Sequence, residues 1–600
     1  MPAIFGAIGA GSPSELEEMG RRLSHRGAHS TWNEIAPRVY LGQVSSVASA
    51  PCVASGTTVV IDASCEDHRE RTRSSLRFFD PTLSLHTESN LPFAFAAYKH
   101  ATRTLLLARD YFGIKPLHFC RLPSGGIAFA TEYKALLAIS EVAAEPDLEA
   151  IAHLQIYKAV PAGRTLLKGI WPVAPGSVLH FDTQGNLQRT QSMPQIDLRV
   201  RPMSEQAACI RLRDKLLEAT SKLVSGHSRI ALALSGGIDS LSVAAMARYC
   251  APDAELIAFT AGQCADDPEV HRAAHAMSHL KGRHETLIVS NEELIAKLPL
   301  AVWHLENPIG RSETFQYLAV AKRARELGVD SLLTGMGADL LFGGMPRHKV
   351  LWMAEALPQI SKHLLAFFLA TQNGKVPSSW LSRCFMKLYY RGNLLAPPTV
   401  INAPECDAPE LLAEPGPEFL NRCLMLDGQE PTSRTLARIE RPLQAFAIDY
   451  SSPYLDTSVV DFAFTIPGAL KIKNGTQKYI LRKAMQPLLG PQLSKAPKEL
   501  MRMKQNLEFA DALESLAQRY LSSDRVRRRG FFDDREVKQI RATAQKPTHP
   551  ENIMRLWTLL VTEIWAEQYI DGRGRHPMPT SASASRERSW AAATPAAALP

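Results

Sequence analysis

The chain has 600 residues, with 68 lysines and arginines against 60 aspartates and glutamates, and a formal net charge of +8 at pH 7. This length is too great for one hydrophobic core and predicts two large domains with appendages. The positive excess is spread along the chain, which argues against nucleic acid as a partner and weakly favours an anionic ligand. No run of about 18 apolar residues occurs, so no membrane-spanning helix is expected.

The N-terminal stretch MPAIFGAIGA is followed by polar and acidic residues, and the first basic residue is Arg21. This order does not fit a secretory signal, which begins with a basic segment. The nine cysteines are scattered and include no CxxC pair, so neither a disulfide framework nor a zinc site is indicated. We therefore expect a cytoplasmic protein.

Residues 1–200 show short apolar runs separated by turn signals, which predicts antiparallel strands in two sheets. Hairpin turns are expected at KHATR (99–103) and DTQGN (182–186), and helices over 12–26 and 131–139. Two prolines and the loss of periodicity in 192–205 indicate a linker. The first predicted domain is therefore 1–200.

From residue 204 onward the pattern changes to helices alternating with short apolar strands. A helix over 204–224, with Ser204 as N-cap, precedes apolar runs at 229–234, 254–260, 284–290 and 329–335. This alternation predicts a parallel sheet covered on both faces. We assign 201–570 to this domain, mostly helical after 345, and 571–600, rich in Ala, Ser and Pro, to a disordered tail.

The stretch ALALSGGIDSLS (231–242) predicts a strand, a glycine turn and a helix. Glycines let the backbone approach an anion closely, and the helix N-terminus favours negative charge. The GK[ST] ending of a Walker loop is absent. An ordinary strand–helix turn is the alternative, but the combined pattern favours a phosphate site. We expect ATP to be bound by Leu234, Ser235, Gly236, Gly237, Ile238, Asp239, Ser240 and Gly335.

A second stretch, LLTGMGADLLFGG (332–344), follows a predicted strand with a Gly-x-Gly turn and Asp339. Ligands of open α/β sheets bind at the carboxyl ends of strands. Carboxylates from neighbouring strand ends are suitable ligands for Mg²⁺ against phosphates. Asp239 and Asp339 are therefore predicted to share a Mg²⁺ ion and to be catalytic.

The SGGIDS loop resembles that of the PP-loop ATP-pyrophosphatases, which transfer AMP to an oxygen, usually that of a carboxylate. In order along the chain, several stretches are similar to the asparagine synthetase superfamily: 108–119, 129–138, 161–182, SGGIDS, TGMGADLLFGG, SSPYLD (451–456) and KNGTQKYILRKAM (473–485). The resemblance implies an N-terminal glutaminase-like (Ntn-type) αββα sandwich. It also implies a C-terminal doubly wound parallel sheet of the PP-loop type, with a helical extension.

The chain departs from that family at two sites that bear on function, the glutaminase site and the position of Met336. An active glutaminase of the family has cysteine after the initiator Met, whereas this chain has Pro2, which carries no nucleophile. HRGAHS (25–30) keeps Arg26 of the glutamine-pocket loop, but Ala28-His29 replace Pro-Asp. Met336 stands where asparagine synthetases carry Glu and β-lactam synthetases Tyr. The first domain is therefore expected to be inactive, and the substrate is expected to bring its own amine.

The resemblance places a catalytic lysine in LSKAPKEL (493–500), at Lys498, with Lys495 as the alternative. A cation there would stabilise the charge of an acyl-adenylate and its tetrahedral successor. The general base is left open. His304 and Glu306 are candidates, and His304 is better interpreted as a structural or pocket residue.

An inactive glutaminase domain, a complete ATP site and a replaced glutamate together resemble the lasso peptide cyclases. The resemblance implies ATP-dependent adenylation of a peptide Asp or Glu side chain, followed by attack of the peptide's N-terminal amine. A precursor peptide and a leader peptidase are the implied partners. Alternatives are a small-molecule ligase of the β-lactam synthetase or asparagine synthetase type, and a non-catalytic protein with a vestigial ATP site. The insertion at 372–432 is expected to border the peptide site.

Overall fold

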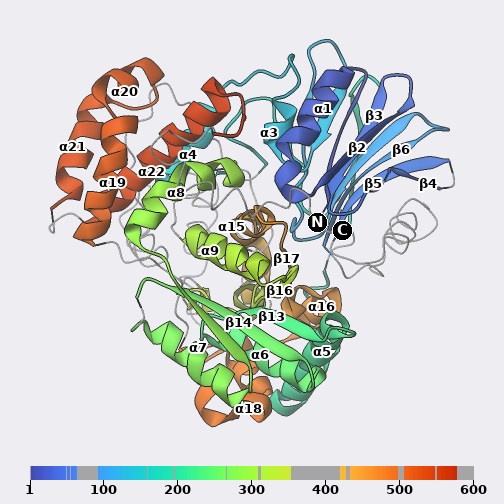
Figure 1. The fold of residues 1–600 in the computed structure, drawn as a ribbon. Coiled ribbons are helices and arrows are strands. Elements are labelled where there is room, and N and C mark those ends of the chain that lie inside the picture. The colour runs from blue at the N-terminus through green and yellow to red at the C-terminus, as the bar shows by residue number, and fades with distance from the viewer. Residues whose placement is uncertain are drawn as a thin grey trace.

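The computed structural model describes residues 2–48, 50–54, 56–63, 92–157, 160–161, 163–193, 196–264, 266–307, 313–346, 348–349, 351–352, 419–427, 433–497, 506–546 and 550–577. Lys498, most of the 372–432 insertion and residues 578–600 lie outside these ranges. Figure 1 shows a strand-rich N-terminal part beside a second sheet flanked by helices, with the C-terminal helices packed alongside. Within the described ranges, no helix combines the length and apolar character needed to span a bilayer.

The N-terminal part contains two six-stranded sheets, with orders β10-β8-β9-β1-β3-β2 and β12-β11-β7-β6-β5-β4. Every strand pair within them is antiparallel, as predicted. The hairpin β6–β7 turns at 100–103 and β11–β12 at 182–186. The strands are β1 Ala3–Ile8, β2 His29–Ala36, β3 Val39–Ser45, β4 Cys52–Ala54, β5 Thr57–Ala63, β6 Phe93–Lys99, β7 Thr104–Arg109, β8 His118–Arg121, β9 Ile127–Ala130, β10 Trp171–Pro172, β11 Ser177–Phe181 and β12 Leu187–Ser192.

A hydrophobic core lies between these two sheets. Its members include Ile4 of β1, Phe129 of β9 and Leu107 of β7, all fully buried. Their positions follow from strand alternation, which directs every second side chain to one face. The helices of this part are α1 Pro13–Arg22, η1 Ser24–Arg26, α3 Tyr133–Leu136 and α4 Leu148–Tyr157.

The second sheet has the order β15-β14-β13-β16-β17, and all its neighbouring strands are parallel. Four of its strands follow the predicted apolar runs. The fifth, β17, was not predicted because it has three residues, two of them polar. The strands are β13 Arg229–Ala233, β14 Glu255–Gly262, β15 Arg283–Ile288, β16 Ser331–Leu333 and β17 Asp449–Ser451.

Helices cover both faces of this sheet, with α5, α6, α7 and α18 on one side and α9 and α15 on the other (Figure 1). Ser204 caps α5 by accepting from the Ala207 amide, as expected. The bounds are α5 Glu205–Val224, α6 Ile238–Cys250, α7 Pro268–His279, α8 Asn291–Leu305, α9 Glu313–Glu326, α10 Ala338–Phe342, α14 Phe419–Asp427, α15 Ser433–Gln444, η3 Pro453–Leu455, α16 Thr457–Thr465, α17 Gly468–Lys471 and α18 Tyr479–Leu493, with the short pair β18 Ile472–Lys473 and β19 Thr476–Gln477.

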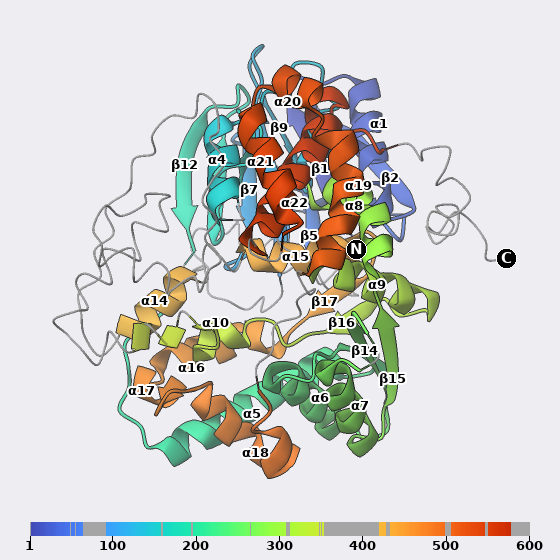
Figure 2. The same ribbon diagram turned by 90° about the vertical axis from the view of Figure 1, so that its left-hand side faces the viewer.

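The C-terminal helices stack beside α4 and α8 (Figure 2). They are α19 Leu507–Tyr520, α20 Ser523–Arg529, α21 Asp534–Ala544, α22 Pro550–Ala566 and η4 Glu567–Asp571. Residues 571–577, which we assigned to the tail, are instead held in place. The Gly574 carbonyl accepts from Trp303 Nε1 at 3.1 Å, and Arg573 donates to carbonyls of the first domain. The stretch DGRGRHP (571–577) shows no hydrophobic periodicity, so these contacts could not be predicted from it.

Candidate active site

The SGGIDS loop connects the end of β13 to the start of α6. Gly236 has φ +70°, and a Cβ there would lie 2.9 Å from the Glu269 carbonyl oxygen. Glycine is therefore required at this turn. The Ser235 amide donates to Ser240 Oγ at 3.1 Å, which closes the loop. Gly237 caps α6 without a side-chain bond, so the first amides of α6 are available to an anion.

The second loop follows β16, the strand next to β13. The Thr334 amide donates to the Ser451 carbonyl at 2.9 Å. Gly337, with φ +95°, then starts the short helix that carries Asp339. A Cβ on Gly335 would lie 2.8 Å from the Asp239 carbonyl carbon, so the two loops touch. Both lie at the carboxyl edge of the sheet, as the sequence predicted.

Asp239 and Asp339 converge on one side chain, Lys478. The Lys478 Nζ lies 2.6 Å from Asp339 Oδ1 and donates to Asp239 Oδ2. Lys478 precedes α18 with φ +56°, and its side chain is 1% exposed. Burial lowers its pKa, an effect that the Asp239 carboxylate opposes.

The lysine is held in place by its neighbours. Its amide donates to the Phe342 carbonyl at 3.2 Å, and Gln477 Nε2 donates to the carbonyls of Gly343 and Met345 at 2.8 and 2.6 Å. Sequence reasoning missed Lys478 as a site residue. The available signal was the Asn-Gly pair at 474–475, a hairpin turn that returns the chain to the loop just before a helix.

The donors present fit a Mg²⁺ ion. Asp239 Oδ1 is buried and has no hydrogen-bond partner among the described residues, and carboxylate oxygens are preferred Mg²⁺ ligands. The described ranges contain no group of three or more His, Cys, Asp or Glu side chains arranged for a metal. Asp239 and Asp339 would therefore hold the ion together with phosphate oxygens and water, as Mg²⁺ commonly binds.

The segment before Lys498 runs past the phosphate loop. The Pro497 carbonyl oxygen lies 3.9 Å from the Cβ position of Gly237. Arg482 fixes this segment by donating to the carbonyls of Ser494 and Ala496 at 3.0 and 2.8 Å. Lys495, the alternative catalytic lysine, is exposed. Lys498 itself lies outside the described residues, so its role stays a prediction.

Met336 lies in the second loop and is partly buried against the core. Its carbonyl accepts from Ser452 Oγ at 2.6 Å. The backbone of this residue thus fastens the loop, while its thioether carries no proton to donate and no charge. A side chain of this kind cannot act as acid or base at this position.

Arg26, the retained residue of the glutamine-pocket motif, is fully buried and faces carboxylates of the protein. It donates to Glu440 of α15, and its Nη1 lies 3.4 Å from Glu132 Oε1. Opposite charges keep the pKa of Arg26 raised although burial opposes this. Pro2, buried, precedes β1. This corner of the first domain therefore holds neither a nucleophile at the strand start nor an uncommitted arginine.

His304 and Glu306 lie at the end of α8, against the first domain. Arg441 Nη2 is 2.9 Å from Glu306 Oε2, and the Lys134 amide donates to Glu306 Oε1 at 2.7 Å. Burial places the pKa of His304 well below its usual value. Glu306, but not His304, belongs to a largely buried group of charged side chains, called here the interdomain charge cluster: Arg26, Asp62, Lys115, Glu132, Lys134, Glu306, Glu440, Arg441 and Asp449.

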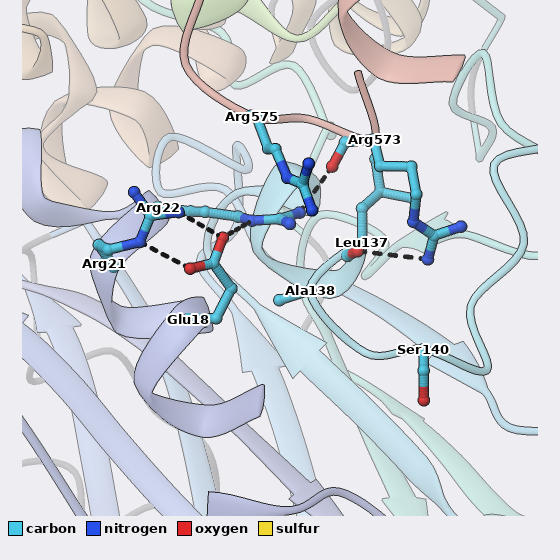
Figure 3. Close-up of a pocket in the computed structure, with 8 residues that line it drawn as sticks. All are labelled: Glu18, Arg21, Arg22, Leu137, Ala138, Ser140, Arg573 and Arg575. Atoms are coloured by element: carbon cyan, nitrogen blue, oxygen red, sulfur yellow. Dashed lines mark hydrogen bonds and ion pairs between the residues drawn. The ribbon is translucent and has the colours of Figure 1, made fainter. Parts of the chain in front are cut away.

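A cavity of about 490 Å³ lies elsewhere, between α1, the chain after α3 and the C-terminal segment (Figure 3). It is lined by Glu18, Arg21, Arg22, Leu137, Ala138, Ser140, Arg573 and Arg575. Arg22 Nη1 donates to the Lys134 carbonyl at 2.9 Å and to the Arg573 carbonyl. The cavity therefore lies where the first domain meets the C-terminal segment, and none of its lining residues belongs to the 235–240 loop.

Comparison with known proteins agrees with this architecture. The family described as asparagine synthase matches residues 211–567, and the glutamine amidotransferase domain matches residues 85–191. Glutamine-hydrolyzing asparagine synthetase 1 of Bacillus subtilis is 26% identical over 516 residues, covering 80% of this chain and 78% of that protein. The carboxyethyl-arginine beta-lactam-synthase of Streptomyces clavuligerus is 27% identical over 411 residues, covering 67% and 63%.

Proposed function

The chain belongs to the asparagine synthase family, and from that premise we propose that it activates a peptide carboxylate with ATP and joins it to an amine of the same peptide. That it is an ATP-dependent amide-forming ligase follows from the family and from its synthetase and beta-lactam-synthase relatives. The proposal adds the substrate, a peptide, and the product, a macrolactam of the lasso type.

The observation that carries this proposal is the pairing of Arg26 with Glu440. Glu440, a carboxylate of the second domain, forms an ion pair with Arg26 of the glutamine-pocket motif. Together with Pro2, this supports a first domain that supplies no ammonia. Met336, which carries no ionisable group, further argues against an ammonia-using site. The amine must then arrive with the substrate.

In the first step, an oxygen of the substrate carboxylate attacks the α-phosphorus of ATP. The new P–O bond forms as the bond to pyrophosphate breaks, which gives an acyl-adenylate. The 235–240 loop and the N-terminus of α6 would bind the departing pyrophosphate. A Mg²⁺ ion held by Asp239 and Asp339 would neutralise phosphate charge during this step.

In the second step, the N-terminal amine attacks the activated carbonyl carbon. A C–N bond forms, the C–O bond to AMP breaks, and the proton that the amine loses passes to the departing AMP phosphate or to solvent. Lys498 is proposed to stabilise the negative charge of the tetrahedral intermediate. Holding both ends of one peptide together makes the attack effectively unimolecular, which supplies much of the acceleration.

The proposed partners are a precursor peptide and the leader peptidase that frees its N-terminal amine. A second candidate function is closure of a small amino-acid derivative, favoured by the similarity to the beta-lactam-synthase. Met336 argues against it, because the Tyr expected in such enzymes is absent. An asparagine synthetase activity is disfavoured for the reasons given for Arg26.

The test is incubation of the protein with ATP, Mg²⁺ and a leaderless precursor peptide encoded beside its gene. The peptide should lose the mass of one water while AMP and pyrophosphate accumulate. Release of ADP in place of AMP would contradict adenylation. Turnover of small amino-acid derivatives with no peptide product would favour the second candidate.

A further inference from the structure

We propose that the first domain is a working part of the ATP site, with its buried Lys115 acting as a positioning residue. Lys115 contacts Asp449 at the start of strand β17, and this contact fixes the position of the strand. Strand β17 is in turn hydrogen-bonded to the loop that leads to Asp339. The proposal rests on the proposed function in one respect, that Asp339 serves Mg²⁺-bound ATP. It does not depend on which acyl substrate is used.

Lys115 is mounted rigidly in the first domain. The Asp110 carboxylate accepts from the amides of Phe112, Ile114 and Lys115 at 3.1, 2.9 and 2.9 Å, which fixes the turn that carries the lysine. The Lys115 side chain is fully buried. Its Nζ donates to Asp449 Oδ1 at 3.2 Å and lies 3.9 Å from Asp62 Oδ1. A cation of one domain therefore meets a carboxylate of the other.

Asp449 begins β17, whose far end supports the active-site loops. Its strand pairs Leu333 with Ser451, and the Ser451 carbonyl accepts the Thr334 amide at 2.9 Å. Ser452 Oγ then donates to the Met336 carbonyl at 2.6 Å. Ser451, which supports the loop that leads to Asp339, is thus two positions along β17 from Asp449, the residue that Lys115 contacts.

The same segment also reaches the other aspartate. The Tyr454 hydroxyl donates to the Asp239 carbonyl at 3.3 Å, and Tyr454 is fully buried. Gly337 packs on it, since a Cβ there would lie 3.1 Å from Tyr454 Cβ. Displacing residues 449–454 would therefore shift both carboxylates relative to each other.

β17 needs such an anchor because it is a three-residue edge strand, paired on one side with β16. A short edge strand has few ladder bonds to fix its position. Buried ion pairs add little net stability compared with apolar packing, but they can specify one arrangement. The helix before β17 is fixed in the same manner, since Arg26 meets Glu440 and Glu132 lies 2.9 Å from Arg441 Nη1.

The experiment compares Lys115→Met with Gln155→Leu in the full-length chain. Gln155 Nε2 donates to Thr562 Oγ1 at 2.8 Å, a buried contact between the first domain and α22 that does not involve β17. Mg²⁺-dependent binding of a non-hydrolysable ATP analogue is measured by calorimetry, and amide exchange is measured over residues 334–344. Neither measurement needs an acyl substrate.

We expect Lys115→Met to weaken Mg²⁺-dependent binding by about tenfold, because a shift of β17 would misplace the two carboxylates relative to each other. Exchange over 334–344 should become faster. Gln155→Leu should lower thermal stability without either effect, and Lys115→Arg should retain both properties of the parent protein. If Lys115→Met does not fold, Asp449→Asn tests the same contact.

Unchanged nucleotide binding and unchanged exchange in a folded Lys115→Met or Asp449→Asn protein would overturn the proposal. An equal loss in Gln155→Leu would also overturn it, because the effect would then be general destabilisation. Failure to cyclise any peptide, with the binding results as expected, would contradict the proposed function and leave the positioning role standing.

Discussion

Lys478 Nζ lies 2.6 Å from Asp339 Oδ1 and also donates to Asp239, so one buried cation joins the carboxylates of the two loops. Without it, two like charges would face each other at the sheet edge. The lysine therefore occupies the position where Mg²⁺ charge is expected. Binding of the ion would rearrange this contact, and Lys478 Nζ would then be able to donate to phosphate oxygens.

Replacing Lys478 by Met should make the protein more dependent on Mg²⁺. In the presence of EDTA, repulsion between Asp239 and Asp339 would then be uncompensated, and the melting temperature should fall. Added Mg²⁺ should raise the melting temperature of the variant more than that of the parent protein. Thermal unfolding with and without Mg²⁺ measures this difference, and equal Mg²⁺ shifts would contradict the bridging role.

Asp239→Asn should abolish AMP release while the fold persists. The substitution removes a charged oxygen ligand from the phosphate end of the sheet, so turnover should fall by more than about 100-fold. AMP formation and the circular dichroism spectrum are the two measurements. Turnover equal to that of the parent protein would remove Asp239 from the site.

Gly344→Ala should damage the site directly. A Cβ there would lie 1.9 Å from Asp339 Oδ1 and 2.1 Å from Lys478 Cε, so both side chains must move. A displacement of this size costs about 100-fold in turnover. Gly328→Ala is the control, because it is strained by φ +70° but has open space around it. It should cost about 1 kcal/mol of stability and leave turnover intact.

His25 of the first domain packs against Trp303 and His304 of α8, and because of it the stability of the protein should fall in mild acid. Burial lowers the pKa of His25 to about 4, although the hydrogen bond to Glu132 opposes this. In the unfolded chain the His25 ring takes up a proton near pH 6.5, whereas in the folded chain it stays neutral down to about pH 4. The contribution of neutral His25 to the free energy of unfolding is therefore complete above pH 6.5. It is lost as the pH falls from 6.5 to about 4, and the total loss is about 3 kcal/mol.

His25→Gln should flatten this dependence, since its amide remains neutral across the range. Urea unfolding of both proteins at about pH 7 and about pH 4.5 gives the comparison. A parallel loss of stability in the parent protein and the variant would assign the effect to other groups, such as His304.

Pro2→Cys should not create glutaminase activity. The restored thiol would stand beside an Arg26 that Glu440 already occupies. Glutamate release in the presence of glutamine is the measurement, and Glu440→Ala combined with Pro2→Cys tests whether the carboxylate is the obstacle. Glutamate release by the single variant would show that the pocket binds glutamine despite this contact.

The fold class could be predicted because strands and helices here have the patterns that burial imposes. Apolar runs such as 229–234 became central strands, and Ser204 capped its helix. Asp239 and Asp339 could be brought together because parallel strands end at one edge of a sheet. Strand β17 could not be predicted, because three residues with two polar side chains carry no period.

The contacts within the interdomain charge cluster could not be predicted from the sequence either. Arg26 and Glu440 are 414 positions apart, and a single sequence holds no record of which distant charges meet. For the same reason Glu306, a candidate base by its motif, could not be recognised as a partner of Arg441. Pairing of buried charges depends on how the domains pack.

Strand β17 is synthesised long after the loop that it supports, and this order has a consequence for folding on the ribosome. Thr334 and Ser451 are 117 positions apart, so the second loop emerges long before the strand that supports it. Until residues 440–451 emerge, Arg26 lacks Glu440 and Lys115 lacks Asp449, and each has only the carboxylates of the first domain near it. A nascent chain should therefore hold its first domain in a loosened, charge-exposed form, and completion of α15 and β17 would set the pace of maturation.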